Sequence, residues 1–268
     1  MSTRIYLGLL TIFASLWFTN HAFAQTSLSA DEIVSKANLA AYYAGKDGRS
    51  DARMKIVDEQ GREQFRQFVI IRRDREEGGE QDILVVFSRP SDVRNTSFLV
   101  NKKPGSDDDR WLYLPGLDLV KRIAASDKRT SFVGSHYYYE DVSGRAPQAD
   151  QHELVGQDEQ YYQLKHTPVD ASNVEFAYYT TAIDKTTFIP MLINYYGASD
   201  QLLRTVEVQK VETIQGYPTV LESKITDHLR NGYTLMQFAF THYDIDIPAS
   251  VFSERSLRNP PQEWLKRR

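Results

Sequence analysis

Cysteine is absent from all 268 residues of the chain. The protein therefore has no disulfide framework, no thiol nucleophile, no thiolate metal ligand and no cysteine to carry a lipoprotein's acyl groups. Its stability must come from a hydrophobic core. A chain of this length can bury such a core in one large β-rich domain or in two small ones.

An excess of basic residues is also missing. The chain has 32 Lys and Arg against 36 Asp and Glu, a formal net charge of −4 at pH 7. A chain with this balance presents no strong positive field to a phosphate backbone. We therefore expect no nucleic-acid partner.

The common catalytic motifs do not occur in the sequence. It contains no Gly-Lys-Ser/Thr phosphate loop, no Gly-x-Ser-x-Gly elbow and no His-Glu-x-x-His metal helix. We predict no enzymatic activity, no cofactor and no metal. One alternative stays open, a lipid or sugar hydrolase that uses Glu140 and Asp141 with His136, although adjacent carboxylates at the start of a helix more often cap it.

The first 24 residues have the pattern of an export signal. Arg4 precedes an apolar run at residues 5–18, and Ala22-Phe23-Ala24 supplies small residues at the spacing that a signal peptidase cleaves. The run is too short for a stable anchor across a hydrocarbon core of about 30 Å. We predict a cleaved signal peptide at residues 1–24 and a single mature domain at residues 25–268.

The mature chain reads as mainly β. Its 16 Tyr and 13 Phe suit a pleated sheet. Ser29 and Glu32 have capping-box spacing and predict one helix that ends near Gly45. Strand patterns follow at residues 52–114 and 153–243, and residues 127–142 suit short helices or a lid-like loop. We expect one continuous antiparallel sheet.

Residues 83–87 form an uninterrupted apolar run, Ile-Leu-Val-Val-Phe. Such a run is typical of a strand that is covered on both faces. The opening helix and residues 127–142 are the segments that we expect to supply the cover.

Several short strings, in a fixed order, resemble one family. They are Arg110-Trp111-Leu112-Tyr113-Leu114-Pro115, Lys121-Arg122-Ile123, Ser131-Phe132-Val133-Gly134-Ser135, Tyr139-Glu140-Asp141, Ala182-Ile183-Asp184-Lys185 and Val251-Phe252-Ser253-Glu254-Arg255-Ser256-Leu257. Together they resemble the periplasmic outer-membrane lipoprotein-sorting family over nearly the whole mature chain. The resemblance implies an incomplete antiparallel β-barrel covered by short helices, with an apolar cavity that shelters acyl chains. It also implies a periplasmic, monomeric protein that serves a membrane exporter of the resistance-nodulation-division (RND) type.

A carrier of this kind needs an apolar cavity rather than a catalytic group. The candidate lining residues are large apolar side chains on predicted strands: Phe65, Val69, Leu84, Val86, Leu99, Trp111, Tyr113, Met236 and Phe238. For each of them the alternative is ordinary core. Trp111 and Tyr113 share one strand face and Leu112 and Leu114 the other, and the sequence leaves open which face looks inward.

The expected function is thus transport of a lipid or lipoprotein whose acyl chains lie in the cavity. The nature of the cargo is open. A second reading, from a different class, is a module that docks on an exporter and holds no cargo, in which case the interior would be filled and aromatic side chains would be exposed at the rim.

Overall fold

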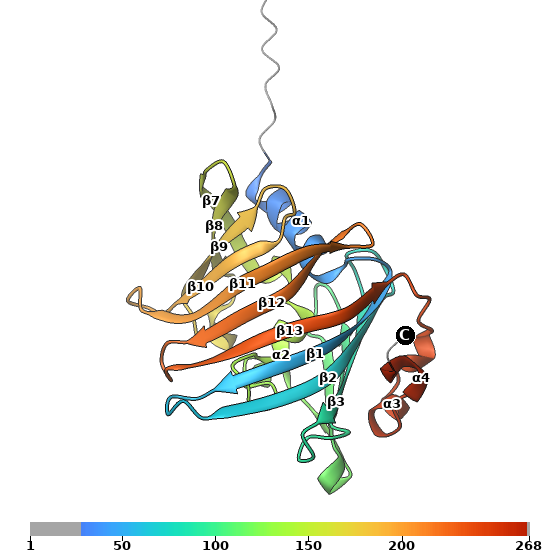
Figure 1. Cartoon of the computed structure of the whole chain (residues 1–268). Helices are drawn as coiled ribbons and strands as arrows, with labels where there is room; N and C mark the ends of the chain where they lie inside the picture. The colour runs from blue at the N-terminus through green and yellow to red at the C-terminus, as the bar shows by residue number, and fades with distance from the viewer. Residues whose placement is uncertain (1–27, 267–268) are drawn as a thin grey trace, which may run out of the picture.

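In the computed structural model, which describes residues 28–266, thirteen strands form one antiparallel sheet (Figure 1). The predicted signal peptide lies outside these residues. The strands in chain order are β1 (Asp47–Val57), β2 (Glu63–Asp74), β3 (Gln81–Arg89), β4 (Ser97–Lys102), β5 (Asp109–Leu114), β6 (Leu119–Arg122), β7 (Asp150–Gln157), β8 (Tyr161–Pro168), β9 (Tyr178–Asp184), β10 (Pro190–Tyr196), β11 (Leu202–Ile214), β12 (Tyr217–Asp227) and β13 (Gly232–Tyr243).

The strand order is β6-β5-β4-β3-β2-β1-β13-β12-β11-β10-β9-β8-β7. Every neighbouring pair is consecutive in the chain except β1 and β13, which join two meanders with Met54 opposite Met236. The sheet curves around a concave face, and β6 and β7 remain its free edges (Figure 1). The predicted fold, a mainly β incomplete antiparallel barrel covered by short helices, is confirmed.

The helix α1 (Ala30–Tyr42) begins at the predicted capping box. The Ser29 backbone N–H donates to Glu32 Oε2 at 2.8 Å, and the Glu32 backbone N–H donates to Ser29 Oγ at 3.3 Å. Ile33 and Ala37 are buried against Leu164 of β8 and Ile183 of β9. These contacts hold α1 across the concave face.

Residues 124–149 form the second cover of the concave face. They contain α2 (Tyr139–Ser143) and short 3-10 turns. Phe132 and Tyr139 pack with Phe98 of β4 at ring-centroid distances of 5.3 and 5.2 Å. This aromatic cluster forms part of the core on the concave side of β2–β5.

The outer, convex face of β2–β5 is covered by the C-terminal segment, residues 245–266, which contains α3 (Glu254–Arg258) and α4 (Gln262–Leu265) (Figure 1). The expectation that only α1 and residues 127–142 cover the sheet was therefore wrong. In the run 83–87, Ile83, Val85 and Phe87 face inward, while Leu84 and Val86 pack under the C-terminal segment. The run is apolar on both faces because two different segments bury it.

Candidate ligand cavity

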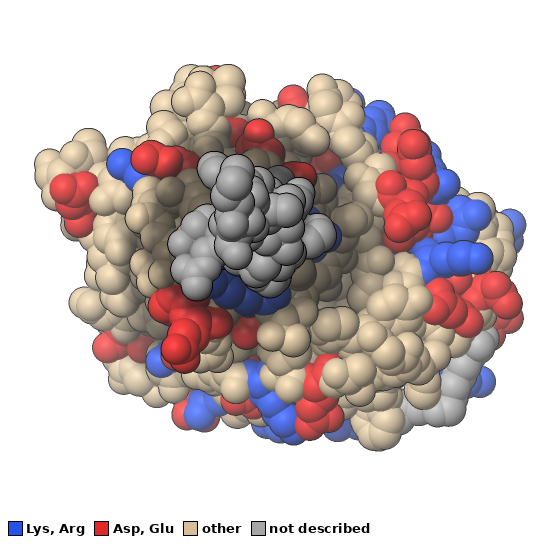
Figure 2. Space-filling model, turned by 90° about the horizontal axis from the view of Figure 1, so that it is seen from above, with Lys and Arg blue, Asp and Glu red and all other residues tan. Residues whose placement is uncertain are grey.

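Two adjoining cavities lie between the helices and the concave face. The first cavity, of about 230 Å³, is enclosed by the end of α1 together with β1–β3, β12 and β13. The second cavity, of about 290 Å³, is enclosed by α1, α2 and strands β7–β13. The side chains that line both are Ala41, Tyr42, Tyr137, Asp141, Ile189, Val220 and Phe238. The face of the molecule seen from above is hollowed, and acidic and basic side chains lie at the margin of the hollow (Figure 2).

Only two of the nine predicted lining residues lie on the described walls of these cavities. Met236 lines the first cavity and Phe238 lines both. Val69, Leu84, Val86 and Leu99 belong instead to the cluster under the C-terminal segment, and Trp111 and Tyr113 pack at its border. Phe65 shares the outer face of β2 and is 37% exposed beneath the Arg53 guanidinium.

The inward residues on these strands are the immediate neighbours of the predicted ones. Phe68, Ile70, Ile83 and Val85 line the first cavity, and Leu112 rather than Trp111 faces inward. Successive residues of a strand point to opposite faces, so a one-residue difference separates cavity from outer core. Because both faces are apolar here, the sequence pattern could not assign them.

The second cavity also contains residues that a pattern could have revealed. Val206 and Val208 of β11 line it, and they alternate with exposed Glu207 and Gln209. This period of two is the signature of a half-buried strand. The strand was predicted, but none of its residues was among the candidate lining residues.

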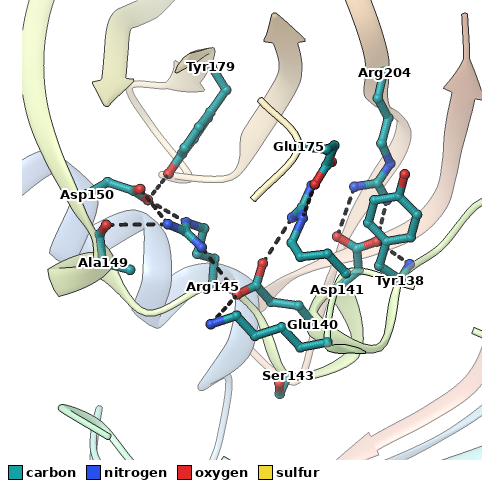
Figure 3. Close-up of polar contacts among 12 residues, drawn as sticks. Tyr138, Glu140, Asp141, Ser143, Arg145, Ala149, Asp150, Glu175, Tyr179 and Arg204 are labelled. Carbon is teal, nitrogen blue, oxygen red and sulfur yellow. Dashed lines mark hydrogen bonds and ion pairs between the residues drawn. The ribbon is translucent and has the colours of Figure 1, made fainter. Parts of the chain in front are cut away.

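Buried charges line one end of the second cavity (Figure 3). The Glu140 carboxylate accepts from Arg129 Nη1 at 2.9 Å and from Arg145 Nη1 at 3.3 Å, and Lys128 Nζ lies 3.5 Å away. Burial of the carboxyl opposes ionisation, but Arg129 and Arg145 outweigh it and hold the pKa of Glu140 below its ordinary value. Arg145 also donates to Asp150 at 2.8 Å.

Asp141 has a different partner from its neighbour Glu140. It pairs with Arg204 of β11, whose Nη1 donates to Asp141 Oδ1 at 3.2 Å. His136 Nδ1 lies 2.9 Å from Thr234 Oγ1, and burial lowers the pKa of His136. The side chains of His136, Glu140 and Asp141 thus have different hydrogen-bond partners, although Arg204 also donates to the His136 carbonyl oxygen at 3.2 Å. Within residues 28–266 no three His, Asp or Glu side chains are grouped as metal ligands.

The wall of the first cavity contains a seam between β12 and β13. The pairing of these strands ends at Glu222 opposite Gln237. Beyond it, residues 217–220 pair with β11, and residues 238–239 and 242–243 pair with β1. Pro218, Thr219 and Val220 on one side of the seam, and Thr241 and Tyr243 on the other, all line the first cavity. The cavity therefore extends to the seam.

A family model described as that of an uncharacterized protein matches residues 79–259, more than half of the chain. The chain belongs to this family, the DUF1329-like family. No curated protein matches the sequence. Among the described helices of this DUF1329-like protein, none is long and apolar enough to cross a membrane.

Three solved structures are similar to this DUF1329-like chain. A DUF1329 family protein from Desulfovibrio piger ATCC 29098 has a TM-score of 0.78 at 25% identity, over 85% of this chain and 97% of that one. A putative outer membrane lipoprotein-sorting protein domain from Vibrio parahaemolyticus has a TM-score of 0.79 at 23% identity, over 86% and 98%. A LolA superfamily protein from Nitrosomonas europaea has a TM-score of 0.66 at 17% identity, over 85% and 99%. The resemblance to the lipoprotein-sorting family is confirmed at the level of the fold.

Proposed function

We propose that this protein is a periplasmic carrier that shelters the acyl chains of a lipid or lipoprotein in the two cavities beneath α1. The observation that carries the proposal is the pair of adjoining, largely apolar cavities on the concave face of a lipoprotein-sorting fold. The docking-module reading expects a filled interior, so these cavities favour the carrier. Met236 and Phe238 are the residues from the predicted set that we retain as ligand contacts.

The energetics of acyl-chain burial suit such a carrier. Transfer of a sixteen-carbon chain from water is worth at most about 13 kcal/mol, at about 0.8 kcal/mol per methylene, before ordering costs. Each cavity is slightly smaller than the usual lower limit of about 300 Å³ for small-molecule sites. A complete chain would therefore occupy both cavities and displace α1 outward to some extent.

The buried charges at the end of the second cavity are compatible with this role because they are paired. Glu140 forms ion pairs with Arg129 and Arg145, and Asp141 forms an ion pair with Arg204. Paired groups form a polar end to an otherwise apolar space, as expected for a ligand with one apolar and one polar end. We infer no catalytic step from them.

The test is lipid analysis of the mature protein purified from a native periplasm. Mass spectrometry should detect a co-purifying acyl lipid in the wild type. Val220→Asp places a charge on the shared wall of both cavities and should abolish the lipid signal. Val155→Asp, at a 52% exposed position on β7, is the matched control and should retain it. A wild-type protein that carries and exchanges no acyl lipid would overturn the proposal.

The exporter partner belongs to the same proposal and rests on the family resemblance. We infer that an inner-membrane RND exporter loads or unloads the carrier. Purified exporter in proteoliposomes should accelerate lipid exchange with the carrier at least tenfold over protein-free liposomes. Equal rates with and without the exporter would contradict the inference.

A further inference from the structure

A third cavity, of about 730 Å³, adjoins the second cavity and is more polar than the first two. Asp31, Ser35 and Leu39 of α1 line it, whereas Val34 and Ala37 of the same helix line the second cavity. Different faces of α1 therefore border the second and third cavities. These two cavities also share four wall residues, Asn38, Glu140, Pro147 and His152. We call the third cavity the polar cleft.

Two buried cations line the polar cleft. Lys102, at the end of β4, is 4% exposed, and Arg110 on β5 is 3% exposed. Lys102 Nζ donates to the Ser143 carbonyl oxygen at 2.7 Å and lies over the rings of Tyr42 and Tyr43. It has no ion pair with a described carboxylate.

Arg110 has one acidic partner and spare donors. Its Nη2 donates to Asp108 Oδ2 at 2.5 Å and to Ser143 Oγ at 3.3 Å. Its Nε and Nη1 are buried and have no hydrogen-bond partner among the described residues. Each buried guanidinium N–H without an acceptor lowers the stability of the protein, because it has lost its hydrogen bonds to water and gained none in return.

The carboxylates near Lys102 already have partners: Asp108 pairs with Arg110, Glu140 with Arg129 and Arg145, and Asp74 with Arg72. Burial lowers the pKa of Lys102 to about 8, although Asp108, Asp74 and Glu140 oppose the shift. Among the described residues, Lys102 therefore has no carboxylate in direct contact. The acidic side chains at the margin of the cleft, Asp31, Glu77 and Asp107, are exposed to solvent.

We propose that the polar cleft binds an anionic head group, a phosphate or a carboxylate, and that Arg110 and Lys102 receive its charge. The inference rests on the proposed function: the head group belongs to the same amphiphile whose acyl chain lies in the second cavity, across the shared wall at Asn38 and Glu140. An anion at this position gives Lys102 a direct counter-charge, and the planar guanidinium of Arg110 suits the paired oxygens of a phosphate or carboxylate. The cargo class is thus an anionic amphiphile.

The test compares two lipids with identical acyl chains, phosphatidylglycerol and uncharged diacylglycerol, which has no phosphate, on the delipidated mature protein. Phosphatidylglycerol should bind at least tenfold more tightly. Arg110→Gln should remove this preference and leave diacylglycerol binding unchanged. Arg122→Gln, which alters an exposed arginine on the adjacent strand β6, is the matched control and should preserve the preference.

A second variant and a spectroscopic readout guard against misfolding. Lys102→Met keeps an apolar stem against Tyr42 and Tyr43, and it should also reduce the preference for the anionic lipid. In the wild type, NMR titration of the Lys102 side chain should show its pKa rising when phosphatidylglycerol binds, because the anion stabilises the ammonium.

The outcomes separate the two proposals. Equal affinity for both lipids overturns the anionic head group and leaves the carrier in place, whereas no binding of either lipid overturns the carrier. Inorganic phosphate serves as the third probe. If phosphate alone binds in an Arg110-dependent manner as tightly as phosphatidylglycerol, the site takes a free anion and the head-group assignment is wrong.

Discussion

Thr219 Oγ1 and the Tyr243 hydroxyl lie 3.0 Å apart, and this hydrogen bond joins β12 to β13 where their backbones no longer pair. Gln215 adds two bonds to the Tyr243 backbone, from its Nε2 to the carbonyl oxygen at 3.0 Å and from the Tyr243 N–H to its Oε1 at 2.8 Å. Side chains from the end of β11 and the start of β12 therefore close the seam in the wall of the first cavity.

Gly48→Ala should loosen this closure. A Cβ at Gly48 would lie 2.9 Å from the Tyr243 ring, so the ring must shift and the geometry of its hydrogen bond to Thr219 must change. We expect a loss of about 1 kcal/mol of stability from the distorted hydrogen bond, faster amide exchange in residues 217–221 and 238–243, and faster lipid exchange. Hydrogen-exchange mass spectrometry measures the amide exchange, and a fluorescent-lipid assay measures the lipid exchange.

Gly116→Ala is the matched control for this change. No atom lies within 4 Å of a Cβ built at Gly116, which lies in the turn after β5. It should leave exchange at the seam unchanged. Equal exchange in wild type and Gly48→Ala would mean that Tyr243 does not close the seam.

Arg49→Gln should release the C-terminal segment. The buried Arg49 side chain donates from Nε to the Trp264 carbonyl oxygen at 3.0 Å and from Nη2 to the Leu265 carbonyl oxygen at 3.2 Å, and it pairs with Asp51. Removing one partner from a buried ion pair costs about 3–5 kcal/mol. Limited proteolysis should then cut within residues 245–266, and the uncovered outer face should bind a hydrophobic dye.

Arg53→Gln provides the comparison for Arg49. Arg53 lies four residues further along β1, is exposed, and stacks on Phe65. Its loss should change stability by less than about 1 kcal/mol, the range of an exposed cation–π contact. Similar proteolysis of both variants would show that Arg49 does not hold the segment.

Most strands and the first helix could be predicted because their signals are local. Ser29 and Glu32 mark the start of α1 by their spacing alone, and alternating residues mark most strands. The short strand β6 was missed since Leu119–Arg122 is only four residues long and follows a turn. Local patterns therefore predicted the architecture but not β6, one of the two edge strands of the sheet.

The cavity walls could not be predicted because they depend on partners far away in the sequence. Val69 and Phe68 are equally apolar, and only the packing of Leu257 and Trp264 on one face decides that Val69 lies outside. The buried cation Arg204 was missed for the same reason, since its partner Asp141 is 63 residues away. Burial of an arginine is stable only with such a partner, which composition does not reveal.

Glu140→Gln should be strongly destabilising. The change keeps the shape of the side chain but removes the charge that Arg129 and Arg145 share. Uncompensated buried cations should cost about 3–5 kcal/mol in urea unfolding at pH 7. Glu222→Gln, at a partly exposed site where the carboxylate accepts only from Gln237, should stay within about 0.5 kcal/mol of wild type. A mild effect at Glu140 would show that the cations there have another source of compensation.

Acid should destabilise the protein through His166. Burial and the neighbouring His152 lower the pKa of His166 to about 3, and its Nδ1 and Nε2 lie 2.8 Å from His152 Nδ1 and Thr181 Oγ1. The unfolded chain, with an ordinary histidine pKa of about 6.5, binds this proton more readily than the folded one. The contribution of His166 is therefore fully present above about pH 6.5 and is lost as the pH falls towards 3, by at most about 1.4 kcal/mol per pH unit.

Urea unfolding at pH 7, 6 and 5 measures this slope. His166→Gln should flatten it, because glutamine does not titrate, whereas His228→Gln, at an exposed site, should leave it unchanged. The His166 variant should also be less stable than wild type at pH 7, since it loses the stacking of the ring on Tyr179. An unaltered slope in His166→Gln would assign the acid sensitivity to another group, such as His136, whose pKa burial also lowers.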